Sequence, residues 1–437
     1  MSKLLERLVC KQLMTYLKDN TLLPDLQSGF RAHHSTETAV LKVMSDILLA
    51  LDSGNLALLT LLDLSAAFDS VDHVTLLSRL HKSYGLDDVV LSWFSSYLTG
   101  RTQYVRTSVT SSDPSAVFYG VPQGSVLGPI LFVLYTADVL QLVKDHGLVP
   151  HAYADDTQIL GICRPSETDE LQTSVSNCLD AVSSWMSDNR LQLNHSKTEV
   201  LWCSSTRRQH QIPTKPVRVG GTSVQPVAVV RNLGVYLDAP VTMRAHVTAT
   251  VRTCFASLRQ ISSIRHSIPR PALLTLLRAL VISKLDYCCS VLAGLPATLL
   301  RRLQSVLNAA ARLVFSASKY SHASPLLLEL HWLKVPERIK FRLCVLVYRC
   351  LNGSAPSYLA ETICPVSSHS TRHRLRSASS STVLIPSTCR STLGDRAFPV
   401  AAAKAWNSLP DHVRDATSLR AFRRQLKTVL FTQSYSD

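Results

Sequence analysis

The sequence lacks the long apolar runs that mark a membrane protein. None of its 437 residues falls in a stretch that approaches the roughly 18 consecutive apolar residues of a spanning helix. The first 17 residues mix charged and apolar side chains at helical spacing, which is typical of an amphipathic helix and unlike a signal peptide. We therefore expect an intracellular protein with no membrane partner.

Paired cysteine spacing is also missing. The 11 cysteines are odd in number and include no Cys-x-x-Cys pair, and Cys and His residues do not cluster at zinc-ligand spacing. The adjacent Cys288 and Cys289 are best explained as buried helix residues. These features argue against a disulfide-stabilised secreted domain and give no sign of a structural metal.

Acidic residues are scarce in the second half of the chain. Residues 241–437 hold 27 Lys and Arg against 8 Asp and Glu, a net charge of +19, whereas residues 1–240 hold 19 against 23, a net charge of −4. A strongly basic half points to a polyanionic partner such as a nucleic acid, although a merely soluble basic surface has the same composition. With 46% apolar residues, the chain is globular rather than disordered.

The first half mixes short apolar runs with amphipathic segments. Residues 56–63 form an apolar run that ends at an acid, which indicates a buried strand, and residues 151–162 are apolar on both sides of two acids, which indicates a hairpin. Further strands are expected in 102–119, 199–203 and 228–237, and helices in 1–50, 73–84, 89–98, 129–144 and 168–189. This order predicts an α+β fold.

Helical periodicity dominates the second half. Helices are predicted at 244–266, 271–293, 297–315, 337–352 and 418–431. The Ser- and Thr-rich segment 367–392, which carries Arg372, Arg374 and Arg376, is expected to be a loop or linker.

Three aspartates accompany the apolar strands. Asp63 ends the first strand, and Asp155 and Asp156 lie at the tip of the hairpin. An acid on a hydrophobic strand has to be paired or metal-bound, and phosphoryl transfer to a nucleotide uses two divalent ions about 4 Å apart that carboxylates bridge. A Mg²⁺ site is one interpretation. Adjacent aspartates are also common in surface turns, so these residues alone are compatible with either a Mg²⁺ site or an ordinary turn.

Three segments resemble the motifs of reverse transcriptases, in the same order. Motifs A, B and C are matched by Leu62-Asp63-Leu64-Ser65-Ala66-Ala67-Phe68-Asp69, by Gly120-Val121-Pro122-Gln123-Gly124-Ser125-Val126-Leu127-Gly128-Pro129 and by Tyr153-Ala154-Asp155-Asp156. The fingers motif, motif D and the primer grip are resembled by Gln27-Ser28-Gly29-Phe30-Arg31, by Asn194-His195-Ser196-Lys197-Thr198 and by Asn232-Leu233-Gly234-Val235. The chain is thus similar to LINE-type (non-LTR retrotransposon) reverse transcriptases over nearly its whole length.

Motif B favours this type over the group II intron maturases, which usually have Gly-Gly and Ser-Pro where this chain has Gly124-Ser125 and Gly128-Pro129. Segments of the second half resemble elements of the vertebrate chicken-repeat clade, namely Leu285-Asp286-Tyr287-Cys288, Asn308-Ala309-Ala310-Ala311-Arg312-Leu313-Val314, Leu330-His331-Trp332-Leu333 and Ala405-Trp406-Asn407-Ser408-Leu409-Pro410. The first fingers motif and an endonuclease are missing, so the chain resembles an N-terminally truncated copy whose endonuclease activity would have to come from another protein. The 8 scattered acids of residues 241–437 make an RNase H domain unexpected.

The resemblance implies roles for individual residues. Asp63, Asp155 and Asp156 would be catalytic and would bind Mg²⁺ or Mn²⁺. Nucleotide contacts would come from Phe68, which would exclude a 2′-OH, from Gln123 and Gly124 along the nucleotide and template path, from Arg31 at the triphosphate and from Lys197 as proton donor to pyrophosphate. Ordinary structural roles remain the alternative for these five.

Nucleic-acid contacts are expected from basic side chains. Arg101, Arg301, Arg302 and Arg312 would contact the phosphate backbone of an RNA template or DNA primer. Trp332 and Trp406 have the chemistry to stack on bases, but burial in the core is the commoner fate of Trp and is the outcome that we expect.

These expectations describe a right-hand polymerase with partial fingers at 1–50, a palm at 51–240, a helical thumb or connection at 241–355, and a linker with a basic, mostly helical C-terminal extension at 356–437. Its expected function is RNA-directed DNA polymerase, acting on dNTPs in the nucleus and cytoplasm. The alternative from another class is a catalytically inactive nucleic-acid-binding remnant. A maturase-like polymerase and a palm-fold nucleotide cyclase are disfavoured by motif B.

Overall fold

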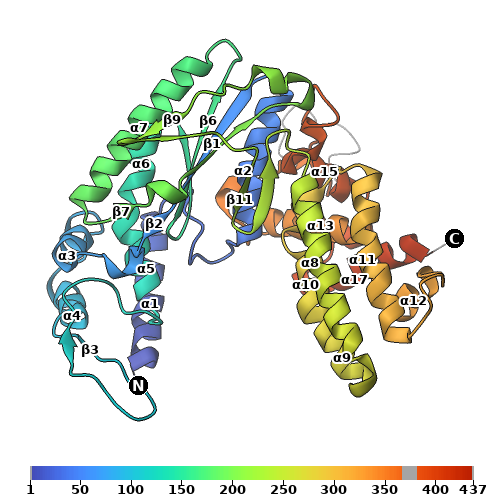
Figure 1. Cartoon of the computed structure of the whole chain (residues 1–437), viewed down its shortest axis with the longest axis horizontal. Coiled ribbons are helices and arrows are strands. Elements are labelled where there is room, and N and C mark those ends of the chain that lie inside the picture. Colours follow the sequence, from blue (N-terminus) through green and yellow to red (C-terminus); the bar gives the residue numbers. More distant parts are fainter. Residues whose placement is uncertain (1, 367–380, 436–437) are drawn as a thin grey trace. The chain divides into compact units, whose positions relative to one another are not determined.

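The apolar run before Asp63 forms strand β1 (Leu56–Leu62), whose side chains are nearly all buried. In the computed structural model, β1 lies between β6 (Asp156–Cys163) and β8 (Glu199–Cys203), and β5 (Val149–Tyr153) lies at the edge beside β6. Figure 1 labels β1 and β6 of this sheet. β5 and β6 are antiparallel. The strands predicted at 56–63 and 199–203 and the hairpin predicted at 151–162 are confirmed.

The structure describes residues 2–366 and 381–435, which group into two units that alternate along the chain. The first unit comprises Met1–His34, Leu58–Val200 and Pro213–Val227, and the second comprises Ser35–Ala57, Leu201–Ile212 and Ala228–Asp437. The segment expected as fingers, residues 1–50, is therefore divided between the two units.

Two helices cover the β5–β6 hairpin in the first unit. α6 (Asp138–Asp145) packs on β5, and α7 (Thr168–Asp188) packs on β6 (Figure 1). α7 buries a stripe of apolar side chains at a spacing of three or four residues, and this stripe is the amphipathic pattern that the sequence predicted: Leu171, Val175, Cys178, Leu179, Val182 and Met186.

The remaining elements of the first unit are one long helix, several shorter helices and short strands. They are α1 (Ser2–Asp19), η1 (Ala67–Asp69), α3 (His73–Lys82), α4 (Asp88–Leu98), α5 (Gly128–Thr136), η2 (His195–Lys197), β2 (Leu64–Ser65), β3 (Thr102–Gln103), β4 (Ser115–Ala116), β7 (Gln192–Leu193), β9 (Val217–Val219) and β10 (Thr222–Val224). The helix predicted over 129–144 is divided into α5 and α6 at Ala137, whose own dihedrals are helical (φ −58°, ψ −37°). The strand pair predicted in 102–119 is only two residues long on each side. The β9–β10 hairpin was not predicted.

α13 (Val335–Leu351) is the central helix of the second unit. It packs against α11 (Ala297–Phe315), α15 (Phe398–Asn407) and α17 (Leu419–Tyr435). The Tyr348 ring of α13 stacks on the Phe422 ring at a centroid distance of 4.6 Å. The Trp406 and Phe422 ring centroids are 5.5 Å apart. Trp332 and Trp406 are 6% and 1% exposed, which confirms that both belong to the core.

The other elements of the second unit are α2 (Thr36–Asp52), η3 (Thr206–Gln211), β11 (Val229–Asn232), β12 (Val235–Asp238), α8 (Arg244–Ser263), η4 (Arg265–Ser267), α9 (Arg270–Leu277), a π-helical turn (Arg278–Ile282), α10 (Ser283–Asp286), η6 (Cys289–Leu292), α12 (Ser324–Glu329), α14 (Ser357–Ala360), η10 (Gly394–Arg396) and α16 (Asp411–Arg414). The strand predicted at 228–237 is the β11–β12 hairpin. Residues 367–380, which carry Arg372, Arg374 and Arg376, lie outside the described residues.

The prediction of one helix over 271–293 is wrong at its C-terminal end. α10 ends at Asp286, Tyr287 is extended, and Cys288 has a φ of 48°. A residue in the left-handed region cannot continue a right-handed helix, so the chain turns here. Cys288 and Cys289 are buried as expected. None of the helices in residues 2–366 and 381–435 is long and apolar enough to cross a membrane.

Candidate active site

Asp155 lies in a two-residue turn at the tip of the β5–β6 hairpin. Because Tyr153 pairs with Asp156, the turn consists of Ala154 and Asp155. Ala154 has a φ of 59°, a conformation that glycine adopts much more readily than alanine. The acid is therefore carried by a strained turn, and such turns persist only where neighbouring segments support them.

Gln27 supplies this support. Its buried side chain accepts hydrogen bonds through Oε1 from the N–H groups of Ala154 (2.9 Å) and Gly29 (2.8 Å), and it donates through Nε2 to the Ala154 carbonyl (3.3 Å). The Ser28 N–H also donates to the Ala152 carbonyl of β5 at 2.8 Å. Both backbone polar groups of the strained alanine are thus satisfied within the protein.

Gly29 allows the two segments to approach this closely. A Cβ atom at position 29 would lie 2.3 Å from the backbone nitrogen of Ala154. The cavity behind the tip, which Phe132 and Trp185 help to line, has a volume of only about 10 Å³, which is room for about one water. The motif that resembles the fingers motif therefore supports the tip of the hairpin, a role that sequence reasoning missed because the two segments are far apart along the chain.

Asp63 follows β1 directly, and its backbone is fixed by the segment that resembles motif D. The Asn194 N–H donates to the Asp63 carbonyl at 2.9 Å, and the next residue, Leu64, pairs with Leu193. Lys197 Nζ lies 3.2 Å from Asp63 Oδ2 in an ion pair. Lys197 thus lies beside the acid, and its expected role as a proton donor stays a prediction.

The carboxylates of Asp63, Asp155 and Asp156, which we call the aspartate cluster, act on one another electrostatically. Desolvation raises the pKa of Asp156, and the negative charges of Asp155 and Asp63 raise it further, to about 6. In the described part of the chain, no group of three or more His, Cys, Asp or Glu side chains is arranged to hold a metal ion. In chemical type, an oxygen-only donor set fits Mg²⁺ or Mn²⁺.

The loop that resembles motif B is tied to the turn that resembles motif A. Gln123 Nε2 donates to both carboxylate oxygens of Asp69 at 2.9 and 3.0 Å, and the Val121 N–H donates to the Phe68 carbonyl at 2.9 Å. Gly120 has a φ of 82°, and a Cβ there would lie 2.9 Å from the backbone of Asp69. The two segments therefore form one continuous piece of structure.

Two predicted nucleotide contacts lie on this piece. The half-buried Phe68 packs against Phe132, with their ring centroids 4.5 Å apart. Gly124 is exposed, has a φ of 73°, and has no atom within 4 Å of a Cβ built at its position. This backbone conformation favours glycine by itself, so the glycine is explained without any close approach of a ligand.

Glu6 is a functional candidate that sequence reasoning missed. Its carboxylate is 7% exposed and accepts hydrogen bonds from the N–H groups of Val126 (2.7 Å) and Leu127 (3.3 Å), just before α5, and from the Tyr97 hydroxyl (3.3 Å). A carboxylate at this end of a helix satisfies unpaired N–H groups and the positive end of the helix dipole. The sequence carried no signal, because a glutamate in an amphipathic helix normally faces water.

The predicted arginines of the first unit both bind loop carbonyls. Arg31 donates to the carbonyls of Pro24 and Gln27. Arg101 donates to the Gly120 carbonyl at 2.8 Å. Each has a structural role in holding a loop, and contact with a triphosphate or with nucleic acid stays a prediction.

The predicted arginines of the second unit differ in how they are held. Arg302 Nη1 donates to the Thr248 hydroxyl at 3.1 Å, and Arg312 Nε donates to the Ser321 carbonyl at 2.9 Å. Arg301 is exposed, and its one described hydrogen bond, to the Ala297 carbonyl of its own helix, is long at 3.4 Å. The aspartate cluster and these three arginines belong to different units.

Comparison with known proteins gives a family match. The sequence pattern described as "Reverse transcriptase (RNA-dependent DNA polymerase)" matches residues 1–235. The chain is 31% identical over 266 residues to the probable RNA-directed DNA polymerase from transposon BS of Drosophila melanogaster, an alignment that covers 60% of this chain and 29% of that protein. It is 28% identical over 352 residues to the RNA-directed DNA polymerase from mobile element jockey of Drosophila funebris, covering 78% of this chain and 37% of that protein.

Among solved structures, apo telomerase from Candida tropicalis overlaps 74% of this chain and 50% of its own, with a TM-score of 0.42 and 13% identity. This overlap is too low to support an argument about the fold. The chain spans about a third of the length of the curated relatives that it matches.

Proposed function

Because the chain belongs to the reverse transcriptase (RNA-dependent DNA polymerase) family, we propose that it adds deoxynucleotides to the 3′-OH of a DNA primer as directed by an RNA template. The observation that carries this proposal is the mutual influence of the aspartate cluster, in which the charges of Asp155 and Asp63 contribute to the raised pKa of Asp156. Carboxylates that influence one another in this way repel one another, and divalent cations relieve that repulsion.

Asp63 and Asp155 are the residues that we assign to Mg²⁺ or Mn²⁺, with Asp156 beside the end of the primer. When bound, a pair of divalent ions stabilises the attacking and leaving oxygens of an in-line displacement. The chain's own contribution is position: Gln27 and Gly29 fix the turn that carries Asp155, and the Asn194 N–H fixes the backbone of Asp63. Errors of about 1 Å at a reacting centre cost on the order of 100-fold in rate, so this support matters for catalysis.

The nucleotide side of the reaction is assigned to the joined motif A and motif B segments. Phe68 would lie under the sugar and exclude a 2′-OH, while Gln123 and Gly124 would line the nucleotide and template path. Arg31 is proposed to contact the triphosphate, because its guanidinium suits bidentate phosphate binding. Lys197, 3.2 Å from Asp63, is proposed to donate a proton to the leaving pyrophosphate.

The architecture that we propose is a right-hand polymerase, with partial fingers in residues 1–50, a palm in 51–240, a helical thumb or connection in 241–355, and a linker with a basic extension in 356–437. Arg101, Arg301, Arg302 and Arg312 would contact the template and primer backbones. The resemblance of the second half to chicken-repeat elements supports a place in that clade, and copying of an element RNA at chromosomal DNA would take the protein to the nucleus as well as the cytoplasm.

Primer extension tests the proposal. The full chain would be incubated with oligo(dT)-primed poly(rA), dTTP and Mg²⁺, beside Asp155→Asn and a matched control, Asp188→Asn, which removes an exposed carboxylate from the end of α7. We expect Asp155→Asn to lower the extension rate by at least about 1000-fold, because several kcal/mol of charge stabilisation is lost, while Asp188→Asn leaves the rate unchanged.

Two results would count against the proposal. Equal extension by the wild type and Asp155→Asn would remove the aspartate cluster from the chemistry. No extension by any of the three proteins, together with salt-dependent binding of the primed template, would select the alternative function of an inactive nucleic-acid-binding protein.

A further inference from the structure

A second concentration of charge lies in the second unit, around a cavity of about 630 Å³. Its lining includes five cationic side chains and one acid, namely Arg278, Arg338, Arg342, Arg423, Lys427 and Asp286. We call this site the basic cavity. Its volume falls within the roughly 300–1,000 Å³ of typical ligand sites, which is room enough for a nucleotide.

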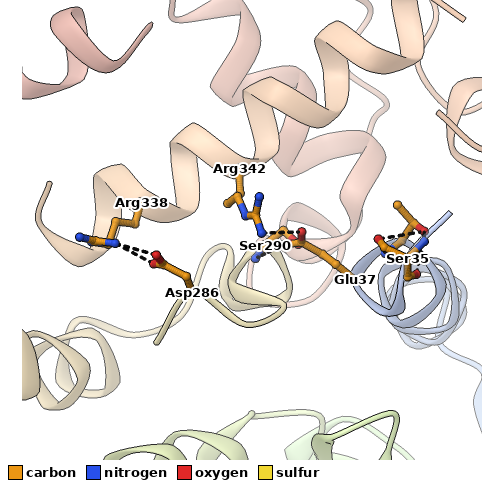
Figure 2. A network of polar contacts seen from close by, with 7 residues as sticks. Ser35, Glu37, Asp286, Ser290, Arg338 and Arg342 are labelled. Carbon is orange, nitrogen blue, oxygen red and sulfur yellow. Dashed lines mark hydrogen bonds and ion pairs between the residues drawn. The ribbon is translucent and has the colours of Figure 1, made fainter. Parts of the chain in front are cut away.

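Two of the arginines are fixed by carboxylates. Arg338 Nη1 donates to both oxygens of Asp286 at 2.9 and 2.8 Å, and Arg342 Nη2 lies 3.5 Å from Glu37 Oε2 (Figure 2). Glu37 also accepts a hydrogen bond from the Ser290 hydroxyl at 2.7 Å. Because the two arginines lie four residues apart on α13, they form one fixed wall of the cavity.

The other three cations have no such partner. Arg278, Arg423 and Lys427 are exposed, and none of them is ion-paired with a carboxylate within residues 2–366 and 381–435. Arg423 and Lys427 lie four residues apart on α17, a spacing at which like charges repel each other and weaken a helix. The fold thus retains a repulsion that a bound anion would relieve.

The backbone at Arg278 gives an independent indication of a site. Arg278 begins the π-helical turn Arg278–Ile282 between α9 and α10. π-helical turns are rare and are frequently found at functional sites. This one places the first cation of the cavity at an irregular point of an otherwise regular helical segment.

The lining also contains an apolar part, formed by Ile282, Leu330, Leu333 and Phe341. The Phe341 ring is half-buried, and Ile282 and Leu333 are buried. A free phosphate ion requires no apolar surface, and a duplex keeps its bases stacked inside. A single strand offers both a phosphate and an unstacked base, so this combination suits it best.

We propose that the basic cavity binds one nucleotide of a single-stranded nucleic acid, with its phosphate against Arg278, Arg423 and Lys427 and its base on Phe341. This proposal rests on the proposed function in one respect: the single strand that binds is taken to be the RNA template. Contacts of this kind give affinity without a choice of sequence.

Fluorescence anisotropy with a labelled 12-nucleotide oligo(U) RNA tests the site in the full chain. The variant is Arg423→Ala/Lys427→Ala, and the matched control is Arg420→Ala/Arg424→Ala, which removes two exposed charges at the same spacing from α17 but outside the cavity lining. We expect the first pair to weaken RNA binding about tenfold and to reduce the salt slope by about 1.4, at 0.7 per lost contact to a single strand. The control pair should change the affinity by less than about twofold.

The Phe341→Ala variant tests the base contact, with Phe341→Leu keeping apolar volume in case the alanine variant fails to fold. Loss of stacking should weaken binding of the single strand about tenfold by Phe341→Ala and by several-fold by Phe341→Leu. Binding of a blunt RNA duplex should be the same in both variants as in the wild type.

Two results would overturn the proposal: equal losses in the cavity and control pairs, and equal losses for the single strand and the duplex in the Phe341 variants. The second result would mean that Phe341 makes no contact with an unstacked base. Asp155→Ala distinguishes this proposal from the proposed function, because loss of primer extension in that variant should leave oligo(U) binding unchanged.

Discussion

The aspartate cluster and the basic cavity carry opposite charges and are built in different ways. Asp155 lies in a turn whose main chain is held by the Gln27 side chain and by close contact with Gly29, which leaves no room for a Cβ atom beside Ala154. The cations lie on helices, and two of them are held by ion pairs between side chains. The contrast indicates that a site which positions reacting atoms is fixed through the main chain, whereas a site that only needs to attract a polyanion is fixed through charge.

This comparison predicts that substitutions at the tip of the hairpin lower primer extension but leave RNA binding at the basic cavity unchanged. Among variants that keep the three aspartates, Gly29→Ala should have the largest effect, because its Cβ would lie 2.3 Å from the Ala154 nitrogen and would displace Asp155. We expect primer extension to fall by about 100-fold, with oligo(U) binding unchanged. The measurement is a single-turnover extension rate beside an anisotropy titration.

Gly221→Ala is the matched control for this variant, since Gly221 is exposed and has no atom within 4 Å of a built Cβ. It should extend primers at the wild-type rate. Full activity in Gly29→Ala would show that the tip adapts to the extra atom, and the inference that main-chain contact fixes the position of Asp155 would fail.

A smaller effect is expected from Gln27→Leu, which keeps the approximate size of the side chain but leaves the N–H groups of Ala154 and Gly29 without their acceptor. Burying these donors unpaired should cost about 2 kcal/mol or more of stability, and extension should fall by roughly tenfold. Urea unfolding and extension assays would measure the two changes. The exposed Gln141→Leu serves as control and should change stability by less than about 0.5 kcal/mol.

If Gln27→Leu lost stability but kept its extension rate, the glutamine would be a packing residue only. Loss of both properties, with extension partly recovered in Gln27→Glu at a pH low enough to protonate the new carboxyl, would support a role in positioning Asp155.

The smallest effect is on stability and depends on pH. The pKa of Asp156 is about 6 in the folded chain, above the ordinary value of 3.8. The folded state therefore binds this proton more tightly than the unfolded state does, and the ionised carboxylate lowers stability above about pH 6 but not below about pH 4. Asp156→Asn, studied with a chelator, should raise the melting temperature by about 1–3 °C at pH 8 and by less at pH 4.5.

Asp113→Asn removes an exposed carboxylate elsewhere and should shift the melting temperature equally little at both pH values. A melting temperature of Asp156→Asn that rose by the same amount at both pH values would contradict the electrostatic coupling within the aspartate cluster.

Much of the local structure could be predicted from the sequence because its causes are local. The apolar run of β1, the stripe of α7 and the acids between two apolar strands each carry their pattern within one segment. The helix predicted over 271–293 shows the limit, since nothing in the periodicity marks the positive φ of Cys288. Pattern reasoning likewise missed the β9–β10 hairpin, whose strands are three residues long.

By itself, the sequence determined most of the longer helices and strands, the three aspartates with their motifs, and the concentration of basic residues after residue 240. Only the tertiary structure decided that Gln27 and Gly29 hold the Asp155 turn, that Glu6 binds the N–H groups before α5, and that Arg278, Arg423 and Lys427 line one cavity. The physical reason is distance along the chain. Helix and strand periodicity reports contacts between near neighbours, whereas hydrogen bonds and charge clusters between residues more than 100 positions apart depend on packing that no single segment specifies.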